Sequence, residues 1–244
     1  MSERMKKIIM WSVIGLLAVG AIVGLVILSN RKSMDYDPRE VHFANDSNGQ
    51  IDEHYFGNLD SEVVLVEYGS FQCPACATAS TRIQALKDEY GDRVLFIFRN
   101  FPLSNQPNSR AAAAAVEAAG LQGKYWEMHN LVFARQSEWS RSSAQRRAEQ
   151  FRGYAEGLGL DIEEWNRDFA SNRVRDKINF DLALGREDNV EGTPFFLLNG
   201  RALTPQEWGN DSRLRQVLDE EIARVAAENA VGNNNSASGD ADQD

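Results

Sequence analysis

Apolar positions gather first in one uninterrupted run near the start of the chain. Residues 8–28 read IIMWSVIGLLAVGAIVGLVIL and contain no charged side chain, while basic residues flank the run on both sides. A helix rises about 1.5 Å per residue, so this run would extend about 31 Å and match a bilayer core of about 30 Å. We therefore expect residues 1–30 to form a cytoplasmic N-terminus and a transmembrane signal anchor.

Two other interpretations of this run stay open. A cleavable signal peptide would need an apolar region of about 7–15 residues and a small-x-small site. Ala18-Val19-Gly20 is such a site, but the apolar run continues to residue 28. A buried core helix is disfavoured because the run has no polar face. The flanking charges are nearly balanced, so they favour a cytoplasmic N-terminus only weakly.

The next apolar segments predict a strand, a helix and a second strand. Val63–Tyr68, VVLVEY, is a β-branched run typical of a strand buried on both faces. A helix is expected from about Cys73 to Tyr90, with Pro74 in its first turn, where the missing N–H costs nothing. RVLFIFRNF, at 93–101, predicts the second strand, joined through a right-handed crossover.

The second half of the chain is helical at first and then returns to strands. TPFFLLNGRAL, residues 193–203, predicts a hairpin with Asn199-Gly200 as a type I′ turn, and an amphipathic helix follows it. The pattern therefore predicts an α/β domain with one sheet and an inserted helical subdomain. Helical propensity or periodicity marks that block at 109–119, 124–133, 144–158, a stretch starting at Asp161, and 174–182.

Composition sets the expected limits of this domain. Residues 31–58 are mostly polar and contain the turn-forming sequence NDSNG, so they are interpreted as a linker. Residues 231–244 end in GNNNSASGDADQD, which has no large apolar residue, and we expect an acidic disordered tail there. The folded domain is expected at 59–230, with its helical insertion at about 104–188.

Net charge and the lack of a phosphate-binding motif limit the possible functions. The formal net charge is −10, whereas a nucleic-acid partner would require a basic face. GLGLD, at 157–161, lacks the spacing of a glycine-rich phosphate loop, and the chain has no other candidate for one. We expect no nucleic-acid partner.

Cys73 and Cys76 are the only cysteines of the chain, and they could form a structural disulfide, bind zinc or act as a reactive pair. As a structural disulfide they would close a minimal loop, which stabilises a fold by only about 2 kcal/mol. As zinc ligands they would need two more partners, but His42, His54 and His129 show no ligand spacing. We therefore predict no metal site and interpret His129 as a core or interface histidine.

A reactive pair explains more of the pattern. The spacing Cys-x-x-Cys at the junction from strand to helix places Cys73 at the helix N-terminus, where unpaired N–H groups and the helix dipole stabilise a thiolate. Cys76 lies one turn further on the same face and can form a disulfide with Cys73. Attack by the thiolate, followed by resolution by the second thiol, is thiol–disulfide exchange.

Two motifs carry a resemblance to a known family. VEYGSFQCPAC together with VEGTPFFLLNG resembles the DsbA-like branch of the thioredoxin superfamily, its membrane-anchored bacterial members included. The likeness covers about Leu59–Ala230, and AAAAAVEAAGLQGKYWEMHNLVF resembles the insertion of that family. It implies a thioredoxin-like fold with an inserted helical subdomain, next to the predicted transmembrane helix.

The resemblance assigns roles to the cysteine motif. Cys73 matches the exposed nucleophile and Cys76 the buried resolving cysteine, so the redox-active disulfide would be the only cofactor. Pro74 and Ala75 match the dipeptide that tunes the redox potential. The strongly oxidising periplasmic enzymes carry Pro-His there, and Ala75 offers neither a side-chain hydrogen bond nor a charge to the thiolate.

Three further residues match the site of that family. Thr193-Pro194 matches the cis-proline loop that faces the disulfide and binds substrate backbone, with threonine where those enzymes carry valine. From the residues alone, Pro194 could be an ordinary trans proline at a strand edge, because only about 5–6% of X–Pro bonds are cis. Glu67 matches a buried acid that takes the proton of the resolving thiol. A solvent-facing strand carboxylate is the alternative for Glu67.

The expected function is that of a dithiol oxidase on the outer face of a cell membrane, anchored by a single span. Its substrates would be cysteine-containing secreted or membrane proteins, because disulfides persist outside the cytoplasm. The resemblance implies reoxidation by an integral membrane, quinone-linked oxidoreductase. A reductase and an isomerase are alternatives in the same class, although no dimerisation domain precedes the fold. A non-catalytic binding module is the alternative from another class.

Overall fold

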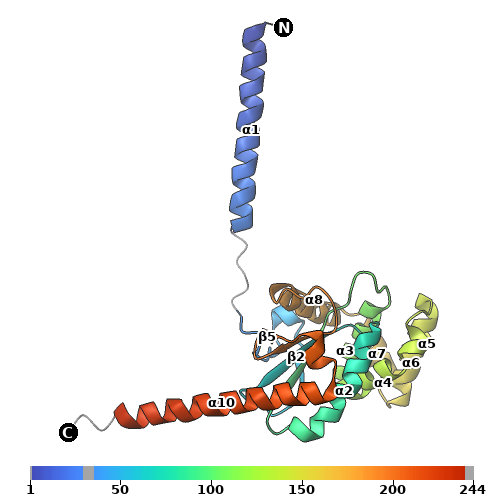
Figure 1. Cartoon of the computed structure of the whole chain (residues 1–244). Helices are drawn as coiled ribbons and strands as arrows, with labels where there is room; N and C mark the ends of the chain where they lie inside the picture. The colour runs from blue at the N-terminus through green and yellow to red at the C-terminus, as the bar shows by residue number, and fades with distance from the viewer. Residues whose placement is uncertain (1, 30–35, 240–244) are drawn as a thin grey trace. The chain divides into compact units, whose positions relative to one another are not determined.

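The computed structural model describes residues 2–29 and 36–239, which fall into two units divided after Tyr36. The first unit contains helix α1 (Glu3–Ser29), drawn in blue in Figure 1. The stretch Glu3–Ile22 has a mean hydropathy of 1.7. Helix α1 is thus long and apolar enough to cross a membrane. A signal sequence shares these properties, so an uncleaved anchor stays a prediction.

One mixed sheet of five strands organises the second unit, in the order β1-β3-β2-β4-β5. β2 and β3 are parallel, and the other neighbouring pairs are antiparallel. All residues of these two central strands are buried, as their continuous apolar runs predict. The strands are β1 (His54–Gly57), β2 (Val64–Gly69), β3 (Leu95–Asn100), β4 (Phe195–Leu198) and β5 (Arg201–Ala202).

Helices connect and cover this sheet (Figure 1). A short 3-10 helix, η1 (Asp46–Asn48), precedes β1, and α2 (Pro74–Tyr90) joins β2 to β3. After the β4–β5 hairpin come α9 (Pro205–Trp208) and α10 (Asp211–Gly239). The block inserted between β3 and β4 consists of α3 (Ser109–Gly120), α4 (Tyr125–Ala134), α5 (Gln136–Trp139), α6 (Ala144–Gly157), α7 (Ile162–Phe169) and α8 (Asn172–Glu187). This is the helical subdomain that the sequence predicts.

The main core lies between the sheet, α2 and the first half of α10. It is made of apolar side chains that alternate inward from the strands and line one stripe of each helix. Trp126 of α4 and Trp208 of α9 pack against its margin. The buried set includes Phe56, Leu65, Ile83, Leu86, Tyr90, Phe96, Phe196, Leu198, Leu214, Val217 and Leu218. α2 is therefore held rigidly against the sheet, and with it the cysteine motif.

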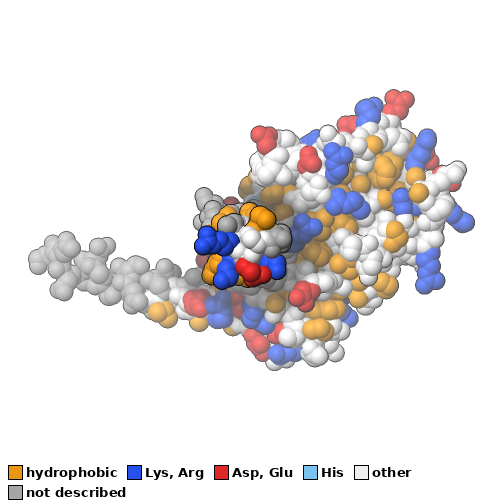
Figure 2. Space-filling view, turned by 90° about the horizontal axis from the view of Figure 1, so that it is seen from above, with side chains coloured by type: hydrophobic (Ala, Val, Ile, Leu, Met, Phe, Trp, Pro, Cys, Tyr) orange, Lys and Arg blue, Asp and Glu red, His pale blue; other side chains and the backbone are white. Residues whose placement is uncertain are grey.

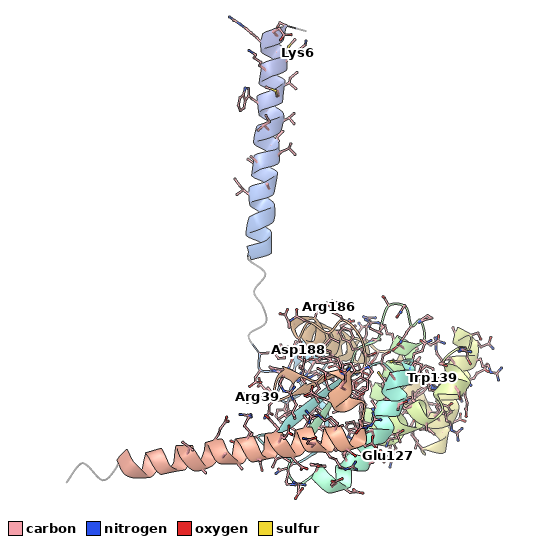
Figure 3. All side chains as sticks on the ribbon, viewed as in Figure 1. Lys6, Arg39, Glu127, Trp139, Arg186 and Asp188 are labelled. Atoms are coloured by element: carbon pink, nitrogen blue, oxygen red, sulfur yellow. The ribbon has the colours of Figure 1, made fainter. Side chains whose placement is uncertain are left out.

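Arg99, a buried arginine of β3, ties the sheet to neighbouring segments. Its guanidinium pairs with Glu53 at 2.5 Å and donates to the Tyr68 hydroxyl at 3.1 Å. The Tyr68 hydroxyl donates in turn to Asp188 at 2.6 Å. Figure 3 shows Asp188 close to Arg186 at the end of α8. Arg99 and Glu53 are both completely buried, so each depends on the other to offset its loss of hydration.

A second buried cluster joins β3 to the helical block. The Asn100 side-chain amide donates to Glu117 of α3 at 2.6 Å and to Asp181 of α8 at 2.9 Å. Lys177 contacts Asp181 at 2.5 Å, and His54 of β1 contacts Glu117 at 2.7 Å. Burial lowers the pKa of Lys177, but the surrounding carboxylates outweigh it and raise that pKa. The ammonium thus stays charged, pairs with Asp181 and attracts the Glu117 carboxylate.

The structure differs from the expected domain limits at both ends. The polar segment expected as a linker, 31–58, is part of the folded unit from Asp37 onward and contains β1, where Phe56 is buried. A strand of four residues is too short for its apolar pattern to be recognised. Residues 31–35 lie outside the described residues.

The C-terminal end also differs from the expected tail. Helix α10 continues through Gly239, so residues 231–239 are helical rather than disordered. Each added residue of a helix gains one backbone hydrogen bond, and no proline stops α10 in this stretch. Residues 240–244 lie outside the described range. The hairpin turn is as expected, since Asn199 and Gly200 have φ angles of 48° and 80°.

Replacing Lys177 by methionine tests the buried cluster. The change leaves Asp181 and Glu117 in the core without their ammonium, so we expect the free energy of unfolding to fall by about 3–5 kcal/mol. Urea denaturation measures it. Lys124→Met is the matched control, because Lys124 pairs with Glu127 on the surface, and should change stability by less than about 1 kcal/mol. Equal losses in both variants would contradict this assignment.

Candidate active site

The two cysteines lie where strand β2 passes into helix α2. Cys73 caps the N-terminus of α2 with extended backbone angles, and Pro74 occupies the start of the helix. A proline fits there because the first turn of a helix leaves its N–H groups without carbonyl partners. Cys76 follows one turn later. Both are free thiols, and Cys76 is 0% exposed, as expected of the resolving cysteine. Cys73 is only 6% exposed, so the expectation of an exposed nucleophile is wrong for this structure, because Thr193 lies against its sulfur.

The surroundings of Cys73 favour its thiolate. The Cys76 thiol and the backbone N–H groups of Cys76 and Ala75 donate hydrogen bonds to its sulfur, and the Thr193 hydroxyl adds to them. These donors outweigh burial and lower the pKa of Cys73 from 9.0 to about 5. Donors at a helix N-terminus stabilise thiolates in this way. Cys73 is therefore ionised at neutral pH and is the better nucleophile of the pair.

Cys76 has the opposite character. Burial raises the pKa of its thiol far above the ordinary value, and its hydrogen bond to Cys73 and the nearby charge of Glu67 raise it further. The backbone N–H of Ser70 donates to its sulfur at 3.5 Å and opposes this only in part. Cys76 thus keeps its proton at neutral pH, and it needs a base nearby before it can attack anything.

The loop before β4 meets the cysteine motif across the sheet. The Thr193–Pro194 peptide bond is cis, as the resemblance implies. When Cys73 is protonated, its thiol donates to the Thr193 carbonyl oxygen at 3.2 Å. The Thr193 hydroxyl oxygen is buried and pairs with no other group in the thiol form, yet it lies close enough to stabilise the thiolate. Pairing of β4 with β2 brings together these residues, 120 positions apart.

Glu67 is buried beneath the cysteines, in the middle of β2. It faces Phe98 on β3 and Phe196 on β4 in the register of the sheet, and it is 5% exposed. Its Oε1 atom has no hydrogen-bond partner. Burial, with a smaller contribution from the charge of Cys73, raises the pKa of Glu67 to about 8. A solvent-facing carboxylate is thereby ruled out, and Glu67 can hold a proton at neutral pH.

Gln136 of α5 supports the cysteine loop and was not among the residues predicted from the sequence. Its side-chain amide donates to the carbonyl oxygens of Phe71 at 2.7 Å and Cys73 at 2.9 Å. Gln72 reaches back and donates to the Ser140 carbonyl oxygen at 2.7 Å. The helical block therefore holds the loop from outside. A single glutamine more than sixty positions away carries no local sequence signal.

The histidines have structural surroundings. His54 pairs with Glu117, and His42 packs edge-on against Phe180 with ring centroids 5.2 Å apart. His129 is buried among aromatic rings, which confirms its interpretation as a core histidine. Over residues 2–29 and 36–239, no three histidine, cysteine or carboxylate side chains group so that they could hold a metal ion.

Replacing Thr193 by valine tests the contribution of its hydroxyl. Valine keeps the shape but removes a donor to the thiolate, so we expect the pKa of Cys73 to rise by about one unit. Ultraviolet absorbance of the thiolate during a pH titration measures it. Thr78→Val is the control, because the Thr78 hydroxyl bonds only to the Pro74 carbonyl oxygen on α2. An unchanged pKa in Thr193→Val would show that the hydroxyl has no such effect.

Known proteins share this fold. The thioredoxin family profile matches residues 50–220. A thioredoxin-like oxidoreductase from Silicibacter pomeroyi DSS-3 is 26% identical, with a TM-score of 0.57 over 78% of this chain and 96% of that one. Oxidised BdbD from Bacillus subtilis has a TM-score of 0.61 over 75% of this chain and 98% of its own. BdbD is only 19% identical, so its likeness is one of fold.

Curated relatives match at higher identity but over a part of their length. The Na(+)/H(+) antiporter NhaA 1 of Mycolicibacterium vanbaalenii is 37% identical over 153 residues, which are 61% of this chain. The chain spans only 22–24% of the length of these antiporters, so their transport activity is not carried over. The family profile covers most of the folded unit, and the solved structures share its architecture. The chain belongs to the thioredoxin family.

Proposed function

We propose that this protein oxidises dithiols of secreted or membrane proteins to disulfides, using the Cys73–Cys76 disulfide and no other cofactor. The observation that carries the proposal is the contrast between an ionised Cys73 and a protonated Cys76 at one helix N-terminus. The donors around Cys73 act only on the reduced protein, because the disulfide has no thiolate to stabilise. A stabilised reduced form makes the disulfide a stronger oxidant.

The size of this effect follows from the pKa of Cys73. With a pKa of about 5, ionisation at pH 7 favours the reduced form about 100-fold over a pair that stays un-ionised. A tenfold change in a two-electron equilibrium corresponds to about 30 mV, so the potential rises by about 60 mV.

Pro74 and Ala75 lie exposed between the cysteines. Of the two, only Ala75 donates to the thiolate, through its backbone N–H.

The exchange runs in two displacements. A substrate thiolate attacks the Cys73 sulfur, the Cys73–Cys76 bond breaks, and Cys76 leaves as a thiolate that takes up a proton. The second substrate thiolate then attacks the substrate sulfur of the mixed disulfide and releases Cys73 as a thiolate. The substrate loses two electrons and the cysteine pair gains them. The low pKa of Cys73 makes it a good leaving group in this second step.

Neighbouring residues assist these steps. Glu67 lies close enough for its charge to act on Cys76, and it holds a proton up to a pH of about 8. We assign to Glu67 the transfer of a proton to Cys76 as Cys76 leaves, and its removal during reoxidation. Thr193-Pro194 borders Cys73 and is assigned to hold the backbone of the substrate next to the attacked sulfur.

The proposed location is the outer face of a cell membrane, with α1 as a single uncleaved span. The length and apolar character of α1 support it, as does the absence of any cysteine beyond the working pair. Reoxidation would require an integral membrane, quinone-linked oxidoreductase that accepts the electrons of Cys73 and Cys76. The face seen in Figure 2 carries acidic, basic and apolar side chains intermingled, rather than a continuous basic surface for nucleic acid.

Oxidation of a dithiol peptide tests the proposed activity. The oxidised full-length protein should convert one equivalent of peptide to its disulfide, and Cys73→Ser should abolish this because it removes the attacked sulfur. Cys76→Ser should fail as well, since without Cys76 the protein cannot form the disulfide that the peptide thiols reduce. Peptide binding without oxidation by the wild type would contradict the proposal and support a binding module.

The same cysteines report the location. In intact cells, a membrane-impermeant thiol reagent should label reduced Cys73 of the full-length protein, and Cys73→Ser should remove the signal. Labelling only after lysis would place the domain in the cytoplasm and overturn the proposed topology.

A further inference from the structure

We propose that Glu67 exchanges its proton with solvent through one water molecule held in a cavity that it shares with His129, which makes His129 a positioning residue for the proton step at Cys76. This inference rests on the proposed function, because it concerns the proton that Cys76 gains and loses in each cycle. It assigns a role in the reaction to a core histidine of the helical block.

A small cavity lies between the sheet, α2 and α4. It offers about 10 Å³ to the centre of a water-sized sphere, which is room for about one water molecule. Glu67 lines it from β2 and His129 from α4. Gln84 and Trp126, both half-buried, line it as well and lead toward the surface. The proposed water reaches solvent past these two partly exposed side chains.

Two polar atoms of this cavity have no partner in the protein. Glu67 Oε1 and His129 Nε2 are both buried and form no hydrogen bond. Leaving such an atom unpaired costs about 1–3 kcal/mol, and a buried water is the usual way to pair it. The Tyr125 hydroxyl is also unpaired, but it does not line this cavity. One water molecule between the two atoms satisfies both.

The hydrogen-bond directions favour a relay through this water. His129 Nδ1 lies 3.0 Å from the Asn130 side-chain oxygen, which accepts, so Nδ1 carries the hydrogen and Nε2 is a bare acceptor. Burial lowers the pKa of His129 to about 4, so the ring is neutral. The water can donate to Nε2 and accept from the protonated Glu67. It can equally donate its second hydrogen to the Glu67 carboxylate.

The water is therefore paired in both protonation states of Glu67 and need not move between them. When Cys76 leaves as a thiolate, Glu67 gives it a proton and becomes a carboxylate. The carboxylate then regains a proton from solvent through the water. The reverse sequence operates when Cys76 must lose its proton to attack a mixed disulfide. His129 fixes the position of the water, and the rings of Phe98 and Phe133 fix His129.

Resolution of a mixed disulfide isolates this proton step. The protein is loaded with glutathione on Cys73, and release of glutathione by Cys76 is followed at a series of pH values. We expect His129→Leu to slow release about tenfold or more at pH 7, within the usual range for a lost proton-transfer group. His129→Gln keeps an acceptor at a similar reach and should stay within about threefold of the wild type. The rate of Cys73 alkylation should be unchanged in both.

Two further variants make the test specific. Glu67→Gln should slow release as well, and Glu67→Gln combined with His129→Leu should be no slower than Glu67→Gln alone, because both act on one path. Phe151→Leu is the control for loosened packing, since Phe151 is buried in the helical block against Trp139 and does not line the cavity, and it should release glutathione at the wild-type rate.

The outcomes separate this inference from the proposed function. Release at the wild-type rate by His129→Leu, or additive losses in the double variant, would overturn the relay while leaving the oxidase activity intact. If the wild type failed to release glutathione at all, both the proton relay and the proposed oxidase function would be contradicted. Should His129→Leu not fold, a high-resolution crystal structure of the wild type decides. A water bonded to Glu67 and His129 supports the relay, and a cavity without one contradicts it.

Discussion

The site depends on one interaction, the stabilisation of the Cys73 thiolate by donors at the N-terminus of α2. The strongest of these donors is the Cys76 thiol, and the same hydrogen bond raises the pKa of Cys76 itself. This one hydrogen bond makes the Cys73 sulfur a good nucleophile and leaving group, and it keeps the Cys76 thiol protonated. The donors lower the pKa of Cys73 despite its burial, so the fold must hold them in fixed positions.

The rest of the structure provides that fixed position. The sheet and core hold α2 in place, and the β2–β4 pairing brings Thr193, whose hydroxyl is one of the donors, to Cys73. From outside, Gln136 binds the carbonyl oxygens on either side of the loop. The helical block that carries Gln136 is tied to β3 by the buried cluster around Asn100 and Lys177. The insertion is therefore part of the active site as much as a cover for it.

Much of this site could be predicted from local sequence, because its chemistry sits in two short motifs. The junction of strand and helix placed Cys73 at the N-cap, and the likeness around Thr193-Pro194 implied the cis bond that the structure has. Strand β1 and the contacts of Gln136 could not be predicted, since a four-residue strand has no clear period and a single glutamine has no local signature. The cavity between Glu67 and His129 arises only from packing of segments sixty residues apart.

The reduction potential of the Cys73–Cys76 pair tests the central claim most directly. It is measured on the full-length protein by equilibration against glutathione buffers of known ratio, with trapping of the thiols. Thioredoxin has a reduction potential of about −270 mV. Because the Cys73 thiolate is stabilised, we predict a potential well above that value, so that the disulfide form oxidises substrate dithiols. A potential at or below about −270 mV would contradict this account and make the protein a reductant supplied with electrons by its partner.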